Sequence, residues 1–138
     1  MTIPGKYYVI NKLSEKYECN FSPIKRKQIM YGGINRGDRI VVCTPSSKIH
    51  ARGHGWFDLT TVQVKLLDDA DVAILAIRLM GKKVYFVNFK DLRKLMTIKN
   101  MHTNTNEGEH WKFYVWDDYI EVRGNHHKFL VTPKIVES

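Results

Sequence analysis

Apolar and polar residues along this chain follow the patterns of short strands and short helices, which predicts a mixed α/β fold. A helix is predicted at 22–33, because Ser22 suits the N-cap, Pro23 suits the first helical position, and two glycines end the segment. We therefore expect a central mixed β-sheet with flanking helices. Its strands are predicted where β-branched and aromatic residues are concentrated, at 6–10, 38–44, 72–79 and 82–89.

The segment at 59–71 fits two patterns, because its apolar residues alternate as in a strand and also recur at helical spacing. Thr60 and Gln63 match the capping box, in which each side chain bonds the backbone N–H of the other residue, and this favours a helix at 61–69. Asn88 is suited to cap a further short helix. The strand alternative at 61–66 stays open at this point.

The last third of the chain predicts an antiparallel β-meander. A polar segment precedes it and is predicted to be a mobile loop. The strands of the meander are expected at 110–116, 119–123 and 128–132, with turn residues between them. No internal repeat or linker is visible, so a single domain is expected. Its parts would be a basic α/β core at 1–97, the loop at 98–109 and the meander at 110–138.

The charge of the chain is positive and unevenly distributed. The 138 residues carry a net charge of +8, and residues 1–58 hold ten Lys and Arg against four Asp and Glu. Such an excess favours a polyanionic partner, above all DNA or RNA. The longest apolar run, at 72–77, is too short to cross a bilayer, so no membrane partner is expected. No secretion signal is visible and the two cysteines fit neither a disulfide framework nor a zinc site, which predicts a cytoplasmic protein.

A row of cationic and titratable residues stands out in "SSKIHARGHGWFDL" (46–59). Written as one strand, this segment places Lys48, His50, Arg52 and His54 on the same side. Imidazoles exchange protons near neutral pH, so the two histidines are candidates for the acid and the base of metal-free phosphodiester cleavage. The Lys and the Arg would hold the phosphate. The alternative is a solvated sheet face without a chemical role.

A second basic group lies at the start of the helix predicted at 22–33. Lys25, Arg26 and Lys27 stand where the helix dipole disfavours cations, which favours an anionic partner. A solvated helix face is the alternative.

The outward side of the predicted meander is a third candidate site. Alternation places Lys112, Tyr114 and Trp116 on one side of their strand, with Arg123 beside them. Aromatic rings among cations suit single-stranded nucleic acid, because bases stack on rings while Lys and Arg meet phosphates. The alternative is that these rings cover a second core or form a contact between copies of the chain.

The order of elements in "FDLTTVQVKLLDDADVAILAIRLMGKKVYFVNFKDL" (57–92) resembles the core of the PD-(D/E)xK nucleases, and most of all the small archaeal Holliday-junction resolvases. The resemblance covers about a quarter of the chain. It implies that two carboxylates on neighbouring strands hold Mg²⁺, which activates a water molecule. It also implies a Lys two residues after the second acid, which stabilises the developing charge.

The first placement of this motif depends on a strand at 61–66. Asp58 would then be the first acid, and Gln63 would replace the second acid ahead of Lys65. Asp58 and Gln63 would face opposite sides of one strand, so they would not share an ion.

The second placement applies if 61–69 is a helix. Asp38 is then the candidate first acid, and Lys48 and His50 stand where the acid and the Lys belong. A Lys in place of a carboxylate repels Mg²⁺. Only a convergence of Asp38 and Asp58 in space would restore a Mg²⁺ site.

Three functions are compatible with these features. The first is a nuclease-like enzyme, possessing either a divergent PD-(D/E)xK site or a metal-free histidine site. The second is a nucleic-acid-binding module without catalysis, which the missing pair of carboxylates favours. The third is a small interaction protein, such as a phage-type inhibitor, that docks on an acidic protein partner. A homo-oligomer is compatible with each of them.

Overall fold

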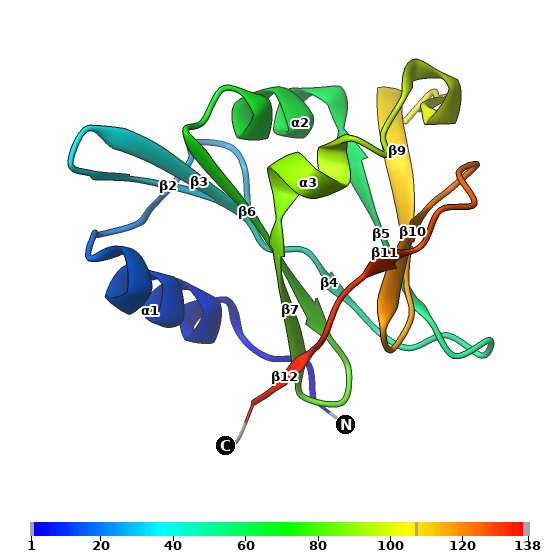
Figure 1. The fold of residues 1–138 in the computed structure, drawn as a ribbon, viewed down its shortest axis with the longest axis horizontal. Coiled ribbons are helices and arrows are strands. Elements are labelled where there is room, and N and C mark those ends of the chain that lie inside the picture. Colours follow the sequence, from blue (N-terminus) through cyan, green and yellow to red (C-terminus); the bar gives the residue numbers. More distant parts are fainter. Residues whose placement is uncertain (1, 107, 137–138) are drawn as a thin grey trace.

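The computed structural model describes residues 2–106 and 108–136, whose strands form two sheets that we call sheet A and sheet B (Figure 1). Sheet A contains, in spatial order, β1 (Ser22–Pro23), β2 (Met30–Asn35), β3 (Asp38–Cys43), β6 (Val72–Leu79), β7 (Lys83–Asn88) and β12 (Lys134–Ile135), with β4 (Ser46–Ser47) also beside β6. Sheet B contains β11 (Phe129–Leu130), β10 (Tyr119–Val122), β9 (Gly108–Val115) and β5 (Gly55–Thr60), with β8 (His102–Asn104) also beside β9. The helices are α1 (Lys6–Tyr17), α2 (Thr61–Asp68), α3 (Phe89–Arg93) and the 3-10 turn η1 (Ile98–Asn100).

Sheet A is covered on both faces, and Figure 1 shows α1 on one side of it with α2, α3 and sheet B on the other. Alternate residues of β3 divide between the two sides: Ile40 and Val42 pack with α1, while Val41 and Cys43 pack with α2 and the inner face of sheet B. Pairs β3–β6 and β4–β6 are parallel and the other pairs of sheet A are antiparallel. The predicted mixed α/β class with a mixed sheet is confirmed.

The middle of the chain folds as the pattern predicts. Thr60 caps α2 through a complete capping box with Gln63, with N···O distances of 3.2 and 2.9 Å. This excludes the strand alternative at 61–66. The β6–β7 hairpin and the cap of α3 by Asn88 are also confirmed, as are the antiparallel strands of the C-terminal meander.

The predicted strand at 6–10 is wrong, because these residues begin α1. Their aromatic and β-branched composition favours a strand locally, but Val9 and Leu13 lie four residues apart and both are buried against sheet A. That spacing places them on one helix face, and burial of this face outweighs intrinsic propensity.

The predicted helix at 22–33 is also wrong: β1, a turn and β2 occupy these residues. The two glycines belong to β2 instead of ending a helix. A Cβ at Gly33 would lie 3.0 Å from the carbonyl oxygen of Asn20 and 3.1 Å from Cys19 Sγ, so a glycine is needed for the close approach of these segments.

The segment at 46–59 is not one strand, which corrects the predicted row of side chains. A turn separates β4 from β5, with hydrogen bonds from His50 N to His54 O (2.9 Å) and from Gly53 N to His50 O (2.8 Å). Gly53 has a φ of 90°, a conformation that glycine adopts without strain.

The polar segment at 98–109, predicted to be a loop, instead contains η1, β8 and the first residues of β9. Trp111 Nε1 donates a hydrogen bond to Thr97 O (2.9 Å), and Asn100 is buried. Strand β9 pairs with β5 along its length, a pairing that no local pattern predicts. None of the helices in the described residues has the length and hydropathy to cross a bilayer.

Candidate nucleic-acid interface

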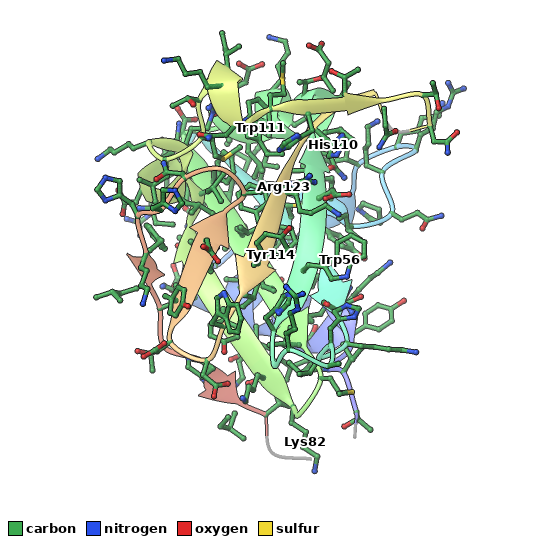
Figure 2. All side chains as sticks on the ribbon, turned by 90° about the vertical axis from the view of Figure 1, so that its right-hand side faces the viewer. Trp56, Lys82, His110, Trp111, Tyr114 and Arg123 are labelled. Atoms are coloured by element: carbon green, nitrogen blue, oxygen red, sulfur yellow. The ribbon has the colours of Figure 1, made fainter. Side chains whose placement is uncertain are left out.

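Sheet B has an apolar inner face and an outer face of aromatic and charged side chains (Figure 2). On β9, Trp111, Phe113 and Val115 are buried against the core, whereas Lys112 and Tyr114 point outward and are partly exposed. The predicted alternation is therefore confirmed from 111 to 115, whereas His110, on the outward side, is buried.

Strand β5 adds its own outward residues to the same face. Trp56 is paired in register with Tyr114, and Asp58 is paired with Lys112. Figure 2 shows Trp56 and Tyr114 side by side on adjacent strands. Trp56 is 38% exposed, which is unusual for so large an apolar side chain.

The rings on this outer face contact one another across strands and turns. His54 lies 4.7 Å from Trp116 and 5.2 Å from Tyr114, measured between ring centroids, and the contact with Tyr114 is edge to face. His50 lies 6.0 Å from Trp56. We call this cluster the aromatic face; its members are His50, His54, Trp56, Tyr114, Trp116 and Tyr119.

The turn between β4 and β5 places His50 and His54 on the aromatic face. Ser47 Oγ accepts a hydrogen bond from Trp56 N (3.0 Å) and donates one to Lys48 O (2.7 Å), which fixes both ends of the turn. Gly55 lies in close contact with β4 and β6, so β5 leaves the turn directly against sheet A.

Sheet A holds the other end of the aromatic face in place. The Tyr85 hydroxyl of β7 donates to the carbonyls of Trp116 (3.3 Å) and Asp117 (3.0 Å). Lys83 Nζ forms an ion pair with Asp117 at 2.8 Å. Burial raises the pKa of Tyr85 to about 12, helped by the nearby Asp117 carboxylate, so this hydroxyl stays protonated and remains a donor at neutral pH.

Two lysines and one carboxylate lie beside rings of this face, and the carboxylate is that of Glu121, whose Oε1 accepts a hydrogen bond from Trp116 Nε1 (3.2 Å). Lys112 Nζ lies 4.1 Å from the Trp56 ring centroid and 3.7 Å from Asp58 Oδ1. Lys128 Nζ lies 4.5 Å from the ring centroid of Tyr119. The two distances from an ammonium nitrogen to a ring centroid are within the range of cation–π attraction, which holds the ammonium groups beside the rings.

A basic hollow of about 470 Å³ lies at the end of sheet B where β8 pairs with β9. Its lining includes no carboxylate among the described residues. Burial lowers the pKa of the half-buried His102, and the guanidinium of Arg123 lowers it further. The basic and titratable residues that line this hollow are Lys99, His102, Arg123, His126 and His127.

The structure brings together many of the residues predicted from the sequence. The histidine pair and the meander residues, which the sequence treats as separate sites, share one face: His50, His54, Lys112, Tyr114 and Trp116. Arg123 N donates a hydrogen bond to Lys112 O (2.9 Å), and Figure 2 shows Arg123 on the same side of sheet B as Tyr114. Lys48 and Arg52 are exposed on the β4–β5 turn.

Other predicted residues lie elsewhere. Lys25, Arg26 and Lys27 lie on the turn between β1 and β2, in sheet A. Lys65 lies on α2 and forms an ion pair with Asp69 at 3.4 Å. The positive excess of residues 1–58 therefore divides among several surfaces instead of forming one patch.

The two candidate metal ligands do not form a Mg²⁺ site. Asp38 is exposed at the start of β3 in sheet A, whereas Asp58 is on β5 of sheet B with Lys112 beside its carboxylate. Strands β2 and β6, the neighbours of β3, carry no carboxylate. In residues 2–106 and 108–136, no group of three or more His, Cys, Asp and Glu side chains is arranged to hold a metal ion. The residues present do not fit Mg²⁺.

Sequence reasoning missed Trp56, Lys128 and His102. Trp56 alternates with the buried Phe57, but its place beside Tyr114 depends on the β5–β9 pairing.

Comparisons with protein-family models, with curated proteins and with solved structures find no match for this chain. The resemblance to PD-(D/E)xK nucleases therefore stays a prediction.

Proposed function

We propose that this protein binds single-stranded nucleic acid on the aromatic face of sheet B. The observation that carries the proposal is the set of partly exposed rings of Trp56, Tyr114 and Trp116, adjacent to one another and bordered by cations. Unpaired bases stack on such rings regardless of their sequence, which contributes about 1–3 kcal/mol per base. A duplex has no free base faces, so the rings favour a single strand.

The charges around the aromatic face suit a phosphate backbone. Lys112 and Lys128 lie beside the rings, and Arg123 lines the basic hollow. The net charge of +8 gives the whole chain a long-range attraction for a polyanion. Rings for bases and lysines for phosphates thus lie together on the outer face of sheet B.

Fluorescence anisotropy with labelled oligonucleotides tests the proposal. Single-stranded polythymidine and polyuridine should bind, and the matching duplexes should bind more weakly. Trp56→Ala and Tyr114→Ala should each weaken single-strand binding by about 5- to 150-fold, the equivalent of one lost stacking contact. Tyr7→Ala is the matched control, because Tyr7 is 82% exposed on α1 and is not part of this face.

Salt and tryptophan fluorescence provide independent measurements. Affinity should fall steeply as salt rises from about 50 to 200 mM, because phosphate contacts release counterions. Stacking should quench tryptophan emission, and Trp56→Ala should reduce that quenching. Equal affinity of Trp56→Ala, Tyr114→Ala and the unchanged protein would refute the proposal, as would a preference for duplex.

One observation favours a second candidate function, metal-free cleavage of RNA. The rings of His50 and His54 lie 6.2 Å apart on the face where the strand would bind. One imidazole would take the proton of a ribose 2′-hydroxyl, whose oxygen then attacks the adjacent phosphorus. The other imidazole would give a proton to the departing 5′-oxygen, leaving a 2′,3′-cyclic phosphate and a free 5′-hydroxyl.

This second function has a distinct test. RNA should be cut in EDTA, DNA should stay intact, and His50→Ala and His54→Ala should each abolish cleavage. Retention of single-strand binding by His50→Ala would show that binding and cleavage are separate. An intact RNA substrate, or cleavage that survives both substitutions, would eliminate the second candidate.

A further inference from the structure

A second hollow lies on the side of sheet A that carries α1, away from sheet B. Its volume is about 560 Å³, and α1, β6, β7 and β12 contribute its walls. None of its lining residues belongs to the aromatic face or to the basic hollow. A ligand in this hollow would therefore contact none of the residues that we propose bind nucleic acid on sheet B.

The apolar surface of this hollow exists because α1 covers only part of sheet A. Leu13 of α1 packs in the same apolar cluster as Ile74 of β6, and both are buried. The helix ends at Tyr17, where Glu18 takes a left-handed conformation with a φ of 50°. Phe86 on β7 also lines the hollow and stays 37% exposed.

Three lysines surround this apolar surface. Lys12 and Lys16 are one turn apart on α1, and Lys134 reaches the hollow from β12, beside β7. No described carboxylate forms an ion pair with any of the three, and no acidic residue lines the hollow. Lys16 Nζ instead lies 5.5 Å from the ring centroid of Tyr17.

Lysines without carboxylate partners beside open apolar surface match a particular class of ligand. The apolar part of the ligand would cover Tyr17, Val72 and Phe86, which line the hollow and keep part of their surface exposed to water. Its negative groups would neutralise the lysines. A volume of about 560 Å³ suits a small molecule, since such sites usually enclose about 300–1,000 Å³.

We propose that this hollow binds a small organic anion with a flat apolar body and at least two negative groups. The flat body is required because the floor is the surface of a β-sheet. One negative group lies toward Lys12 and Lys16 on α1, and the other lies toward Lys134 on β12. A ligand with one negative group would leave the lysine or lysines on one side of the hollow without a negative partner.

Isothermal titration calorimetry with naphthalene-1,5-disulfonate as the probe tests this proposal on the full chain. The disulfonate should bind at one site, more tightly than naphthalene-1-sulfonate and much more tightly than neutral naphthalene-2-methanol. Inorganic sulfate, which has the charge without the apolar body, should bind more weakly than the disulfonate. Affinities that do not differ among the four probes would overturn the proposal, as would no detectable disulfonate binding.

Variants locate the binding site. Lys16→Gln and Lys134→Gln should each weaken disulfonate binding by about two- to fivefold at low salt, the usual effect of one exposed charge. Phe86→Ala should weaken it through loss of apolar contact. Lys25→Gln, an exposed lysine outside the hollow, is the control and should leave the affinity unchanged. If Lys25→Gln and Lys134→Gln lost equal affinity for the disulfonate, the loss would come from the lower net charge of the protein. That result would contradict the proposed site.

Discussion

The contact between Gly55 and sheet A provides a quantitative test of how sheet B is attached. A methyl group on Gly55 would lie 2.4 Å from Leu79 Cδ1 and 3.1 Å from Ser47 Oγ. Leu79 is buried in the core and Ser47 makes two hydrogen bonds, so neither side chain can move freely. The methyl group must therefore push β5 away from β4 and β6.

The expected cost follows from two opposing terms. Forcing one extra carbon into a packed core destabilises a protein by about 1–3 kcal/mol. Alanine restricts the unfolded chain more than glycine does, which offsets about 0.4–1 kcal/mol of that cost. We therefore expect Gly55→Ala to lower the free energy of unfolding by about 1–2 kcal/mol, measured by urea denaturation.

Gly32→Ala is the control for this measurement. A Cβ there meets only Ile24 and a carbonyl oxygen at 3.8–3.9 Å, which is ordinary contact, so no loss of stability from a clash is expected. The double variant Gly55→Ala/Leu79→Ala should lose less than the sum of its two single variants, because the smaller side chain makes room for the methyl group. Strictly additive losses, or a Gly55→Ala variant as stable as the unchanged protein, would refute the reasoning.

Three further predictions concern polar groups. Tyr85→Phe removes the two hydrogen bonds to Trp116 and Asp117 and should cost about 1–2 kcal/mol in urea unfolding. The pKa of Tyr85 in the folded state, about 12, lies above the ordinary value of 10.0. The stability that the protonated phenol contributes is therefore complete below pH 10 and is lost as the pH rises through 12. Over that range the unchanged protein and Tyr85→Phe should converge in their free energies of unfolding. Arg123→Ala removes one cause of the lowered pKa of His102, so NMR titration of that imidazole should show its pKa rise toward 6.5; an unchanged titration would contradict the assigned cause. Arg78→Met removes the side-chain hydrogen bonds of a buried guanidinium to Thr44 and Pro4, and should cost about 2–4 kcal/mol. It should also speed hydrogen exchange at Gly81 and Lys82, whose amides bond Thr2 O; unchanged exchange would show that Arg78 does not anchor the first residues.

Local sequence signals predicted those elements whose determinants lie within a few residues. The capping box of Thr60 and Gln63 identifies α2, and the apolar runs on both sides of Gly81 identify the β6–β7 hairpin. The errors have a common cause in long-range packing. Val9 is helical because Leu13 and sheet A bury one face of α1, and Gly33 lies in a strand because residues 19–21 pack against it.

The candidate site shows the same limit. Tyr114 and Trp116 were predicted to face outward from their own strand, and that requires only alternation. Their contact with His54 depends on the turn at 50–54 and on the pairing of β5 with β9, which joins segments about fifty residues apart. The prediction that residues 46–59 alternate as one strand was wrong, because the turn at 50–54 interrupts the strand.

Strand β5 is fixed at both ends, and this determines how the surface around Trp56 can change. At one end Gly55 abuts Leu79, and at the other Thr60 is both the last strand residue and the cap of α2. A single inserted or deleted residue between them would reverse the phase of the strand, turning Trp56 toward the core and Phe57 toward water. The outward positions can therefore accept new side chains, whereas the number of residues from 55 to 60 is held constant by the architecture.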